Sequence, residues 1–298
     1  AGYDIAALFG IRNFYEKWGY IPALPEYRIT VRTEAITDAQ LHHRVVDYTE
    51  QYKPAVLRMY NDNNRKRTCA IVRHSKSWKG FTKGTTFRVD ATVKVFIDDT
   101  GEPCGYVSFD DTDERTAVAE IGYTTPSVFG SMVALIAQRA SEHGHEEAYI
   151  TMPPDHPFAI YLRRYDCNVI ERFAKTGGGM MRIINLEKLF AKIAGELSQR
   201  LRASTLCNWA GAFGIITDIG SVQVNIASQR VIIEPLSGGA TYPTIELPQG
   251  KLIQLVVGYC DIATIALDND VNVSPDLTPL LDALFPLGYP YIWWSDRF

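Results

Sequence analysis

Short apolar stretches, separated by turn residues, run along most of the chain. The stretch "YDIAALFG" (3–10) is a continuous apolar run and "YRITVRTEAI" (27–36) alternates, so both predict strands. Residues 11–20 between them predict a helix, with Asn13 as its N-cap and Gly19 as its C-cap. The N-terminal part therefore reads as strand, helix, strand.

The middle of the chain alternates predicted helices and strands. A helical segment over residues 38–64, interrupted at Pro54, comes first. The next two strands form a hairpin, because turn residues at 99–103 separate them. The further predictions are strands over 86–99, 104–111, 117–124 and 146–153, helices over 127–144 and 156–167, and a strand leading into a helix over 178–190.

Two places in this pattern share one order of elements. At 3–31 the order is strand, helix with an aromatic pair, short loop, strand. The same order recurs at 147–186, although the two copies share little identity. The first copy has no counterpart of the helices and strands that lie upstream of these last strands in the second copy.

The character of the chain changes from about residue 191. An amphipathic helix precedes several short alternating strands with Gly, Asn, Ser and Asp turns. A further helix is predicted to open after Pro248 and to close at Gly258, and a last helix leads into an aromatic tail. The pattern predicts an α/β (α+β) protein, with a mixed sheet flanked by helices and then a separate α+β unit joined at 190–206.

Composition and charge narrow the function classes. With 298 residues the chain is too long for one ordinary core, and its 46% hydrophobic and 21% charged content is typical of a globular protein. The net charge of −4 does not favour binding to a phosphate backbone, so we expect no nucleic-acid partner. No apolar run approaches the roughly 20 residues of a membrane span, and no secretory signal is present.

The cysteines indicate neither a disulfide framework nor a zinc site. They are odd in number and widely spaced, and no CxxC motif occurs. We therefore expect a reducing, cytoplasmic setting and no metal. The five are Cys69, Cys104, Cys167, Cys207 and Cys260.

Several motifs resemble known acetyltransferases. The element order of 40–186 resembles the GNAT superfamily of acetyl-CoA-dependent N-acetyltransferases, and "NFYEKWGY" (13–20) resembles its late helix. The back of the chain is similar to the Eis (enhanced intracellular survival) acetyltransferases, which carry two tandem GNAT domains and a sterol-carrier-protein-like domain. That similarity rests on "GGGMMRIINLEKLF" (177–190), "NWAGAFGIIT" (208–217), "LPQGKLIQLVVGY" (247–259) and "LFPLGYPYIWWSDRF" (284–298).

The resemblance implies three domains. Residues 1–36 would be the end of a first GNAT domain, 37–189 a second, degenerate GNAT domain, and 190–298 the sterol-carrier-protein-like domain. Since the chain begins at Ala1 and lacks the front of the first domain, we expect a fragment; a naturally short gene product is the alternative. The family also implies a ring-like homo-oligomer.

Tyr15 is the candidate general acid. In the GNAT pattern the tyrosine of "FYEK" directs its hydroxyl at the CoA sulfur, and a phenol with a pKa near 10 suits protonation of a thiolate. The alternative is an aromatic residue that packs on the sheet. Tyr20 is a second choice for the acid and a packing residue otherwise.

Phe298 is the candidate base. The Eis family uses its C-terminal carboxylate in this role, and "WWSDRF" resembles that ending. Burial beside Trp293 and Trp294 would raise the low pKa of an α-carboxylate. The alternative is a disordered or simply packed tail, and Asp296 is either a second carboxylate of the site or a surface residue.

The phosphate-binding loop of the family is missing. Its pattern is a basic residue or Gln, two residues, Gly, one residue, and Gly or Ala, placed between a strand and a helix. At that position, residues 122–135, no basic residue precedes Gly130, and Pro126 removes an N–H. The glycine-rich stretches at 175–181 and 235–243 are predicted to be turns, so acetyl-CoA would lack its binding loop in this chain.

Other polar clusters are weaker candidates. The basic run 64–67 reads as a solvated helix end, and the histidines of 41–44 and 143–147 read as surface residues. No nucleophile motif such as GxSxG occurs. Cofactor-binding residues beyond the missing loop cannot be assigned.

Two functions compete. In the first, the intact protein is an acetyl-CoA-dependent N-acetyltransferase for primary amines, such as aminoglycoside-like or lysine amines, and this chain alone is inactive. In the second, the chain is a scaffold, oligomerisation or apolar-ligand-binding module. We also expect self-association through the exposed edge of the 3–10 strand, a lipid-free C-terminal domain, and a tail docked near Tyr15.

Overall fold

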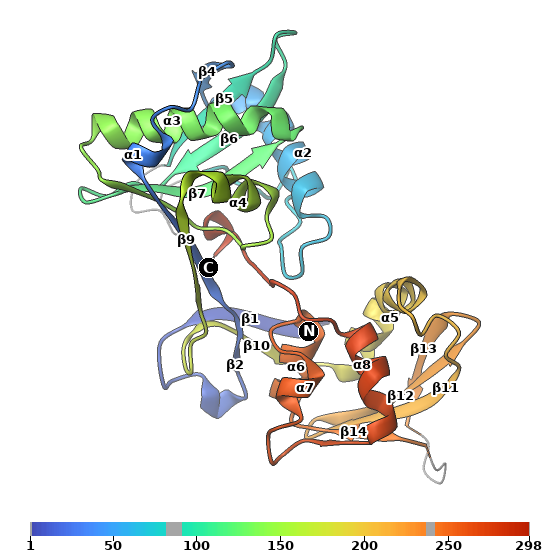
Figure 1. Ribbon diagram of the computed structural model, residues 1–298. Helices are drawn as coiled ribbons and strands as arrows, with labels where there is room; N and C mark the ends of the chain where they lie inside the picture. The colour runs from blue at the N-terminus through green and yellow to red at the C-terminus, as the bar shows by residue number, and fades with distance from the viewer. Residues whose placement is uncertain (1, 82–90, 237–241, 298) are drawn as a thin grey trace. The chain divides into compact units, whose positions relative to one another are not determined.

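The computed structural model describes residues 2–81, 91–236 and 242–297, and the chain divides into two compact units (Figure 1). Unit 1 comprises Ala1–Pro25 and Phe173–Pro290. Unit 2 comprises Glu26–Arg172 and Tyr291–Phe298. Each unit therefore combines segments that lie far apart in the sequence.

Unit 2 is built on a seven-stranded mixed sheet of order β4-β5-β6-β7-β8-β3-β9. Only β7 and β8 are parallel neighbours, and the other pairs are antiparallel. The strands are β3 (Glu26–Arg32), β4 (Arg44–Asp47), β5 (Thr92–Ile97), β6 (Pro103–Phe109), β7 (Thr116–Tyr123), β8 (Glu147–Ile150) and β9 (Cys167–Arg172). The helices and helical turns are α1 (Thr33–Ile36), η2 (Glu50–Tyr52), α2 (Lys53–Asn64), η3 (Pro126–Val128), α3 (Phe129–Glu142), α4 (Pro157–Leu162), η4 (Arg163–Tyr165) and η6 (Trp294–Asp296).

The sheet of unit 2 buries apolar side chains on both faces. Tyr106 and Val107 are neighbours on β6 and point to opposite faces, because side chains alternate along a strand. Tyr106 belongs to a cluster with Val56 and other residues of α2, and Val107 belongs to a larger cluster with residues of α3 and α4, such as Met132. Each helix layer therefore closes one face of the sheet.

Unit 1 contains two sheets. The first has three strands in the order β1-β10-β2, and the second has five in the order β13-β12-β11-β14-β15. The strands are β1 (Ile5–Gly10), β2 (Ile21–Leu24), β10 (Gly178–Ile183), β11 (Gly211–Thr217), β12 (Gly220–Ala227), β13 (Arg230–Pro235), β14 (Thr244–Glu246) and β15 (Asn272–Val273). The helices and turns are η1 (Glu16–Trp18), α5 (Leu186–Ala203), α6 (Gln249–Val257), α7 (Ile262–Ile265), η5 (Pro275–Leu277) and α8 (Thr278–Leu284).

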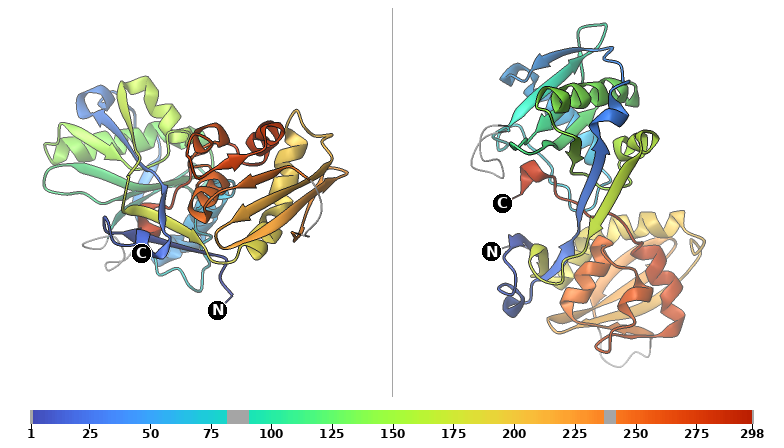
Figure 2. Two further views of the ribbon diagram at one scale, coloured as in Figure 1. Left: turned by 90° about the horizontal axis from the view of Figure 1, so that it is seen from below. Right: turned by 60° about the vertical axis from the view of Figure 1, so that its left-hand side comes forward.

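The two copies of the predicted repeat exchange one strand. In the first copy, β1 and β2 flank β10, which comes from the second copy. In the second copy, β8 and β9 flank β3, which comes from the first, and Figure 2 shows β3 and β9 running side by side. The recurring order at 3–31 and 147–186 is thus confirmed for the strands, whereas the helix of the first copy is reduced to the turn η1.

The exchange explains why the compact units cut across the three predicted domains. Strand β3 lies within the predicted domain 1–36, but it pairs with strands of unit 2. Strand β10 lies within the predicted domain 37–189, but it pairs in unit 1. The boundaries 1–36, 37–189 and 190–298 remain a prediction about sequence domains.

The predicted fold class is confirmed, with three local corrections. The strand predicted over 27–36 ends at Arg32, and α1 follows it at Thr33–Ile36. The helix over 38–64 was wrong in its first half, which contains β4, and Pro54 lies in the first turn of α2 instead of interrupting a helix. Asn13 is not an N-cap: it has φ 57°, and only the short turn η1 forms before Gly19. Gly19 and Gly258 do close their helical segments, each with φ 78°.

Candidate functional site

Tyr15 lies in unit 1, on the short segment between β1 and η1. Its ring is half-buried and packs over Gly10, where an added Cβ would lie 2.6 Å from Tyr15 Cδ2. Its ring centroid lies 5.0 Å from that of Phe14 and 6.1 Å from that of Tyr20. The Tyr15 ring can occupy this position because Gly10 has no side chain.

Gln249, at the start of α6, forms hydrogen bonds that hold the turn carrying Tyr15 in place. The amide nitrogen of Gln249 donates to the carbonyl of Gly19 at 2.6 Å, and its side-chain oxygen accepts from Ile183 N–H at 2.8 Å. Farther along α6, Gln254 donates to the carbonyl of Pro22 at 2.7 Å. Two glutamines of the motif 247–259 therefore join α6 to the sheet β1-β10-β2 and to the turn that carries Tyr15.

The second feature lies in unit 2, where the parallel strands β7 and β8 separate; the term crevice refers below to this strand separation. Their pairing runs from Thr116 to Val118 on β7, and Thr151 N–H still bonds to the carbonyl of Val118 at 3.0 Å. Strand β7 then continues to Tyr123 without β8 beside it. Such separations at the carboxyl ends of parallel strands are common ligand sites in α/β folds.

The C-terminal tail fills this crevice. Tyr291 and Trp293 are each 1% exposed and belong to the apolar cluster of α3 and α4. The hydroxyl of Tyr291 donates to the carbonyl of Thr151 at 3.1 Å, and the indole N–H of Trp293 donates to Asn64 Oδ1 at 2.6 Å. The tail is therefore part of the core of unit 2.

Beyond Trp293 the tail meets a buried ion pair. Arg73 Nη1 and Nη2 donate to the two carboxylate oxygens of Glu120, at 2.7 and 2.5 Å. Arg73 Nε donates to Asp296 Oδ1 at 2.8 Å, and Ser295 Oγ donates to Glu120 Oε2. Tyr106 and Tyr60 complete the network, donating to Glu120 and Asp296, each at 2.6 Å.

Burial and charge act against each other in this network. Burial alone would lower the pKa of Arg73, but the carboxylates of Glu120 and Asp296 outweigh it and hold the pKa well above its usual value. Burial raises the pKa of the Asp296 carboxyl, and Arg73 partly offsets that rise. The guanidinium also lies 3.6 Å from the ring centroid of Tyr60, a cation–π contact.

Three asparagines at the end of α2 organise the site. Asn61 exchanges two hydrogen bonds with the backbone of Arg73, at 2.9 and 3.0 Å. Asn63 does the same with the backbone of Tyr123, at 3.0 and 2.9 Å, and Asn64 holds Trp293. The last turn of α2 thus positions the arginine, the end of β7 and the tail.

At 122–135, where the family's phosphate loop would lie, several backbone N–H groups are already bonded within the protein. Tyr123 N–H bonds to Asn63, and Thr124 N–H bonds to the carbonyl of Cys104 at 2.9 Å. Val128 N–H faces the carbonyl of Thr125 at 3.5 Å, and Pro126 has no N–H. The residues at this place therefore do not fit the phosphates of acetyl-CoA.

The glycine-rich stretches do not supply a replacement. Gly177 and Gly178 have φ 73° and 72°, and β10 begins at Gly178, so the predicted turn before a strand is confirmed. The stretch 235–243 lies mostly outside the described residues.

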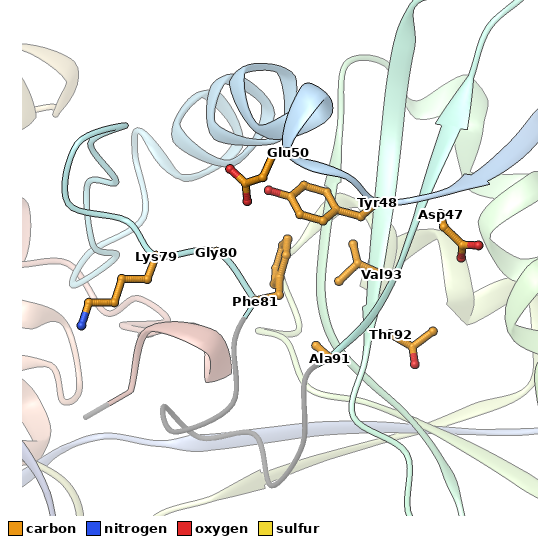
Figure 3. A pocket seen from close by; sticks show the side chains of 9 residues that line it. All are labelled: Asp47, Tyr48, Glu50, Lys79, Gly80, Phe81, Ala91, Thr92 and Val93. Atoms are coloured by element: carbon orange, nitrogen blue, oxygen red, sulfur yellow. The ribbon is translucent and has the colours of Figure 1, made fainter.

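Unit 2 also has a surface pocket of about 320 Å³ (Figure 3). Its lining includes Asp47, Tyr48, Glu50 and Phe81, and the Tyr48 hydroxyl points toward Glu50. Burial, followed by the Glu50 charge, raises the pKa of Tyr48 to about 12. Asp47 pairs with Lys94 at 2.6 Å, and Glu50 lies 3.4 Å from Lys53, so both carboxylates have cation partners.

The predicted site residues have different outcomes. Tyr15 is placed in unit 1 and its chemical role stays a prediction, while Phe298 lies outside the described residues. The expected docking of the tail is confirmed for 291–297, and its partners named above belong to unit 2. Docking near Tyr15 stays a prediction. Asp296 is buried, not on the surface.

Sequence reasoning missed Arg73 and Glu120. Glu120 was a detectable signal, because it is a lone charge inside the apolar strand "AVAEIGYT" and a buried carboxylate needs a cation. The basic run 64–67 was only partly solvated as predicted: Arg65 and Lys66 are exposed, while Asn64 is buried. Arg67 pairs with Asp155 at 2.7 Å.

The mixed sheet with one parallel pair, flanked by helices on both faces, is the fold of the GCN5-related N-acetyltransferases (GNATs). No family model matches the sequence, and no curated protein matches it significantly. Among the helices of residues 2–81, 91–236 and 242–297, none combines the length and apolar character that a bilayer crossing requires.

Solved structures with this fold match the chain almost from end to end. A GCN5-related N-acetyltransferase from Anabaena variabilis has a TM-score of 0.73 at 14% identity, covering 99% of this chain and 73% of that one. One from Kribbella flavida has 0.71 at 15%, covering 100% and 71%. Eis1 from Mycobacterium abscessus has 0.61 at 15%, covering 100% and 74%.

Proposed function

We propose that the intact protein is an acetyl-CoA-dependent N-acetyltransferase that acts on primary amines, such as aminoglycoside-like or lysine amines. The observation that carries the proposal is the likeness in fold to GNAT structures along 99% or more of the chain. The motif "NFYEKWGY" and the ending "WWSDRF" supply the Eis-like part of the proposal.

Two residues are proposed for the chemistry. Tyr15 holds the proton for the leaving group, on a turn fixed by Gln249 and Gly10. The carboxylate of Phe298 accepts the proton of the amine. Neither role requires unit 2 to bind the cofactor, since residues 122–135 of unit 2 do not fit the phosphates of acetyl-CoA.

Three further proposals accompany this function. Residues 190–298 correspond to a sterol-carrier-protein-like domain that holds no large lipid, because Ile215, Val222, Val224 and Ile226 are buried at its centre, whereas Ile216 is half-buried. The protein is cytoplasmic and forms a homo-oligomer. Mass spectrometry of native extracts tests for bound lipid, and an extracted sterol or fatty acid would contradict the first proposal. Light scattering at tens of micromolar tests the homo-oligomer, and a monomer mass would contradict it.

The function is tested by thiol release from acetyl-CoA with a panel of primary amines. The protein as it occurs in its source and the 298-residue chain are assayed side by side. We expect transfer by the first and none by the second, and Tyr15→Phe should lower kcat by roughly 100-fold or more. Absence of transfer by the natural protein with every amine would overturn the proposal.

A second candidate is a scaffold or binding module. It is favoured by the closed crevice of unit 2 and by the occupied donors at Tyr123 and Thr124. An inactive natural protein that assembles with itself or with an apolar ligand would support this candidate.

A further inference from the structure

We infer that β9, the outer strand of the sheet of unit 2, is a surface through which two copies of this chain pair, with the two β9 strands antiparallel and centred on Val169. The inference gives a surface to the homo-oligomer proposed above and rests on that proposal, but it does not depend on acetyl transfer. The partner it names is a second copy of the same strand.

Strand β9 is an edge strand whose outer side is open. Its one neighbour among the described strands is β3, with which it pairs over residues 167–172 without a shift of register. In an antiparallel pair, alternate residues direct their N–H and C=O groups at the neighbour, so the residues between them direct theirs outward. Such a row of outward groups is a template for a further strand.

Both faces of β9 are exposed as well as its edge. All residues from 168 to 172 are exposed, although they form a regular strand. Val169 is 39% and Ile170 41% exposed, and they lie on opposite faces because side chains alternate along a strand. A second strand beside β9 would therefore cover apolar side chains on both faces and bond the outward backbone groups.

The opposite edge of the same sheet is protected. Strand β4 covers only four residues, Arg44–Asp47, and has a charged residue at each end. Short edge strands and charges are means by which native sheets avoid pairing with each other. Strand β9 has six residues, without Pro or Lys, and its centre is apolar. The contrast selects β9 as the edge that can accept a partner.

Backbone geometry limits the registers in which two β9 strands can pair. Opposed residues must both direct their N–H and C=O groups at the partner or both away from it, so they lie an even number of positions apart. When Val169 lies opposite its own copy, Arg172 lies opposite Asp166. When Ile170 is the centre, Arg172 lies opposite Asn168, and no opposite charges face each other.

Charge complementarity favours the register centred on Val169. Asp166 and Arg172 are exposed, and none of the ion pairs within residues 2–81, 91–236 and 242–297 uses either of them. Opposite charges that face each other across two strands stabilise the pairing. Since a two-fold axis repeats each contact, one Asp166–Arg172 pair would form at each end of the paired strands.

The register is tested by sedimentation velocity on two charge variants of the 298-residue chain, alone and mixed. Arg172→Asp would place two carboxylates opposite each other at each end, and Asp166→Arg would place two guanidiniums there. Each variant alone should pair at least about 10-fold more weakly than the native chain, because two attractive contacts become repulsive.

An equimolar mixture of these two variants restores opposite charges at both ends. It should therefore form heterodimers with a Kd close to that of the native pair, which also shows that both variants fold. A mixture as weakly associated as the single variants would overturn the register centred on Val169.

The strand itself is tested with Val169→Lys, which would place two ammonium groups opposite each other at the axis. The matched control is Val72→Lys, the same change at a residue that is 67% exposed on an irregular segment of unit 2. Val169→Lys should raise the Kd of self-association by about 10-fold or more, and the control should equal the native chain.

The outcomes separate this surface from the wider proposals. A native chain that stays monomeric at tens of micromolar would contradict both the homo-oligomer and the role of β9. Native self-association that persists unchanged in Val169→Lys and in both charge variants, as expected if the edge of β1 carries it, would overturn β9 alone. Acetyl transfer is decided separately, by thiol release.

Discussion

The two copies of the repeat have similar strands but different surroundings. In the first, the turn between β1 and β2 leaves Phe14 39% and Trp18 45% exposed. In the second, α4 between β8 and β9 buries Phe158 and Leu162 to 0% and 1% exposure. One repeat order can thus present an open aromatic turn or a closed helix.

The C-terminal tail contributes to the closed state of the second copy. His156, the N-cap of α4, lies edge-on to the Trp293 ring, with centroids 5.7 Å apart. Trp293 comes from residues that follow α4 by more than a hundred positions. What covers a repeated element is therefore decided by distant sequence, while the order of its strands is local.

The largest expected effect is on the free energy of unfolding, when a tryptophan packed against the second copy is compared with one in the first copy. Trp293→Ala should lower the free energy of unfolding by about 3–5 kcal/mol, because it removes a fully buried ring and leaves Asn64 Oδ1 without its indole donor. Trp18→Ala, at the exposed turn of the first copy, should change it by about 0.5 kcal/mol. Urea denaturation measures both, and equal losses would contradict the comparison.

The next largest expected effect is a loss of stability at low pH, which arises in the second copy of the repeat. His156 Nδ1 accepts from Phe158 N–H at 3.2 Å, and burial, followed by Arg67, lowers the pKa of His156 to about 3. The unfolded state binds a proton below pH 6.5 and the folded state does not, so stability is lost as pH falls from there toward 3. Between pH 8 and pH 5 the loss should be about 2 kcal/mol.

The control for this prediction is His156→Asn, which keeps a capping acceptor but cannot titrate. Its stability should lack the His156 part of the pH dependence, as followed by urea unfolding at pH 5 and pH 8. A native protein as stable at pH 5 as at pH 8 would show that His156 is not held neutral.

The smallest expected effect is a null one. The 298-residue chain should not bind acetyl-CoA with a low-micromolar or tighter Kd, because the donors at Tyr123 and Thr124 are occupied. Calorimetric titration measures this directly. Tight binding would mean that the closed crevice of the second copy opens for a ligand.

Much of the fold could be predicted from the sequence because its signals are local. Turn residues at 99–103, Gly258 after α6 and the alternation in β3 all act within a few residues. The strand exchange could not be predicted this way. The alternating pattern predicts that β3 is a strand but does not indicate which strands it pairs with. Its partners β8 and β9 lie more than a hundred residues away in the sequence.

The site was less predictable for the same reason. Aromatic content alone indicated that the tail is buried, since Tyr291 and Trp293 carry large apolar area. The ion pair that contacts the tail combines Arg73 from an irregular segment with Glu120 from a strand, and neither residue belongs to a motif. Only the three-dimensional fold brings those two charges and Asp296 together.

The most direct test of the account is hydrogen exchange of the tail in the native chain, followed by mass spectrometry on peptides that cover 291–297. Docking predicts that the amides of Tyr291 and Asp296, which bond to the carbonyls of Thr68 and Trp293, exchange as slowly as the sheet of unit 2. Exchange at the rate of a free chain end would contradict the claim that the tail closes unit 2.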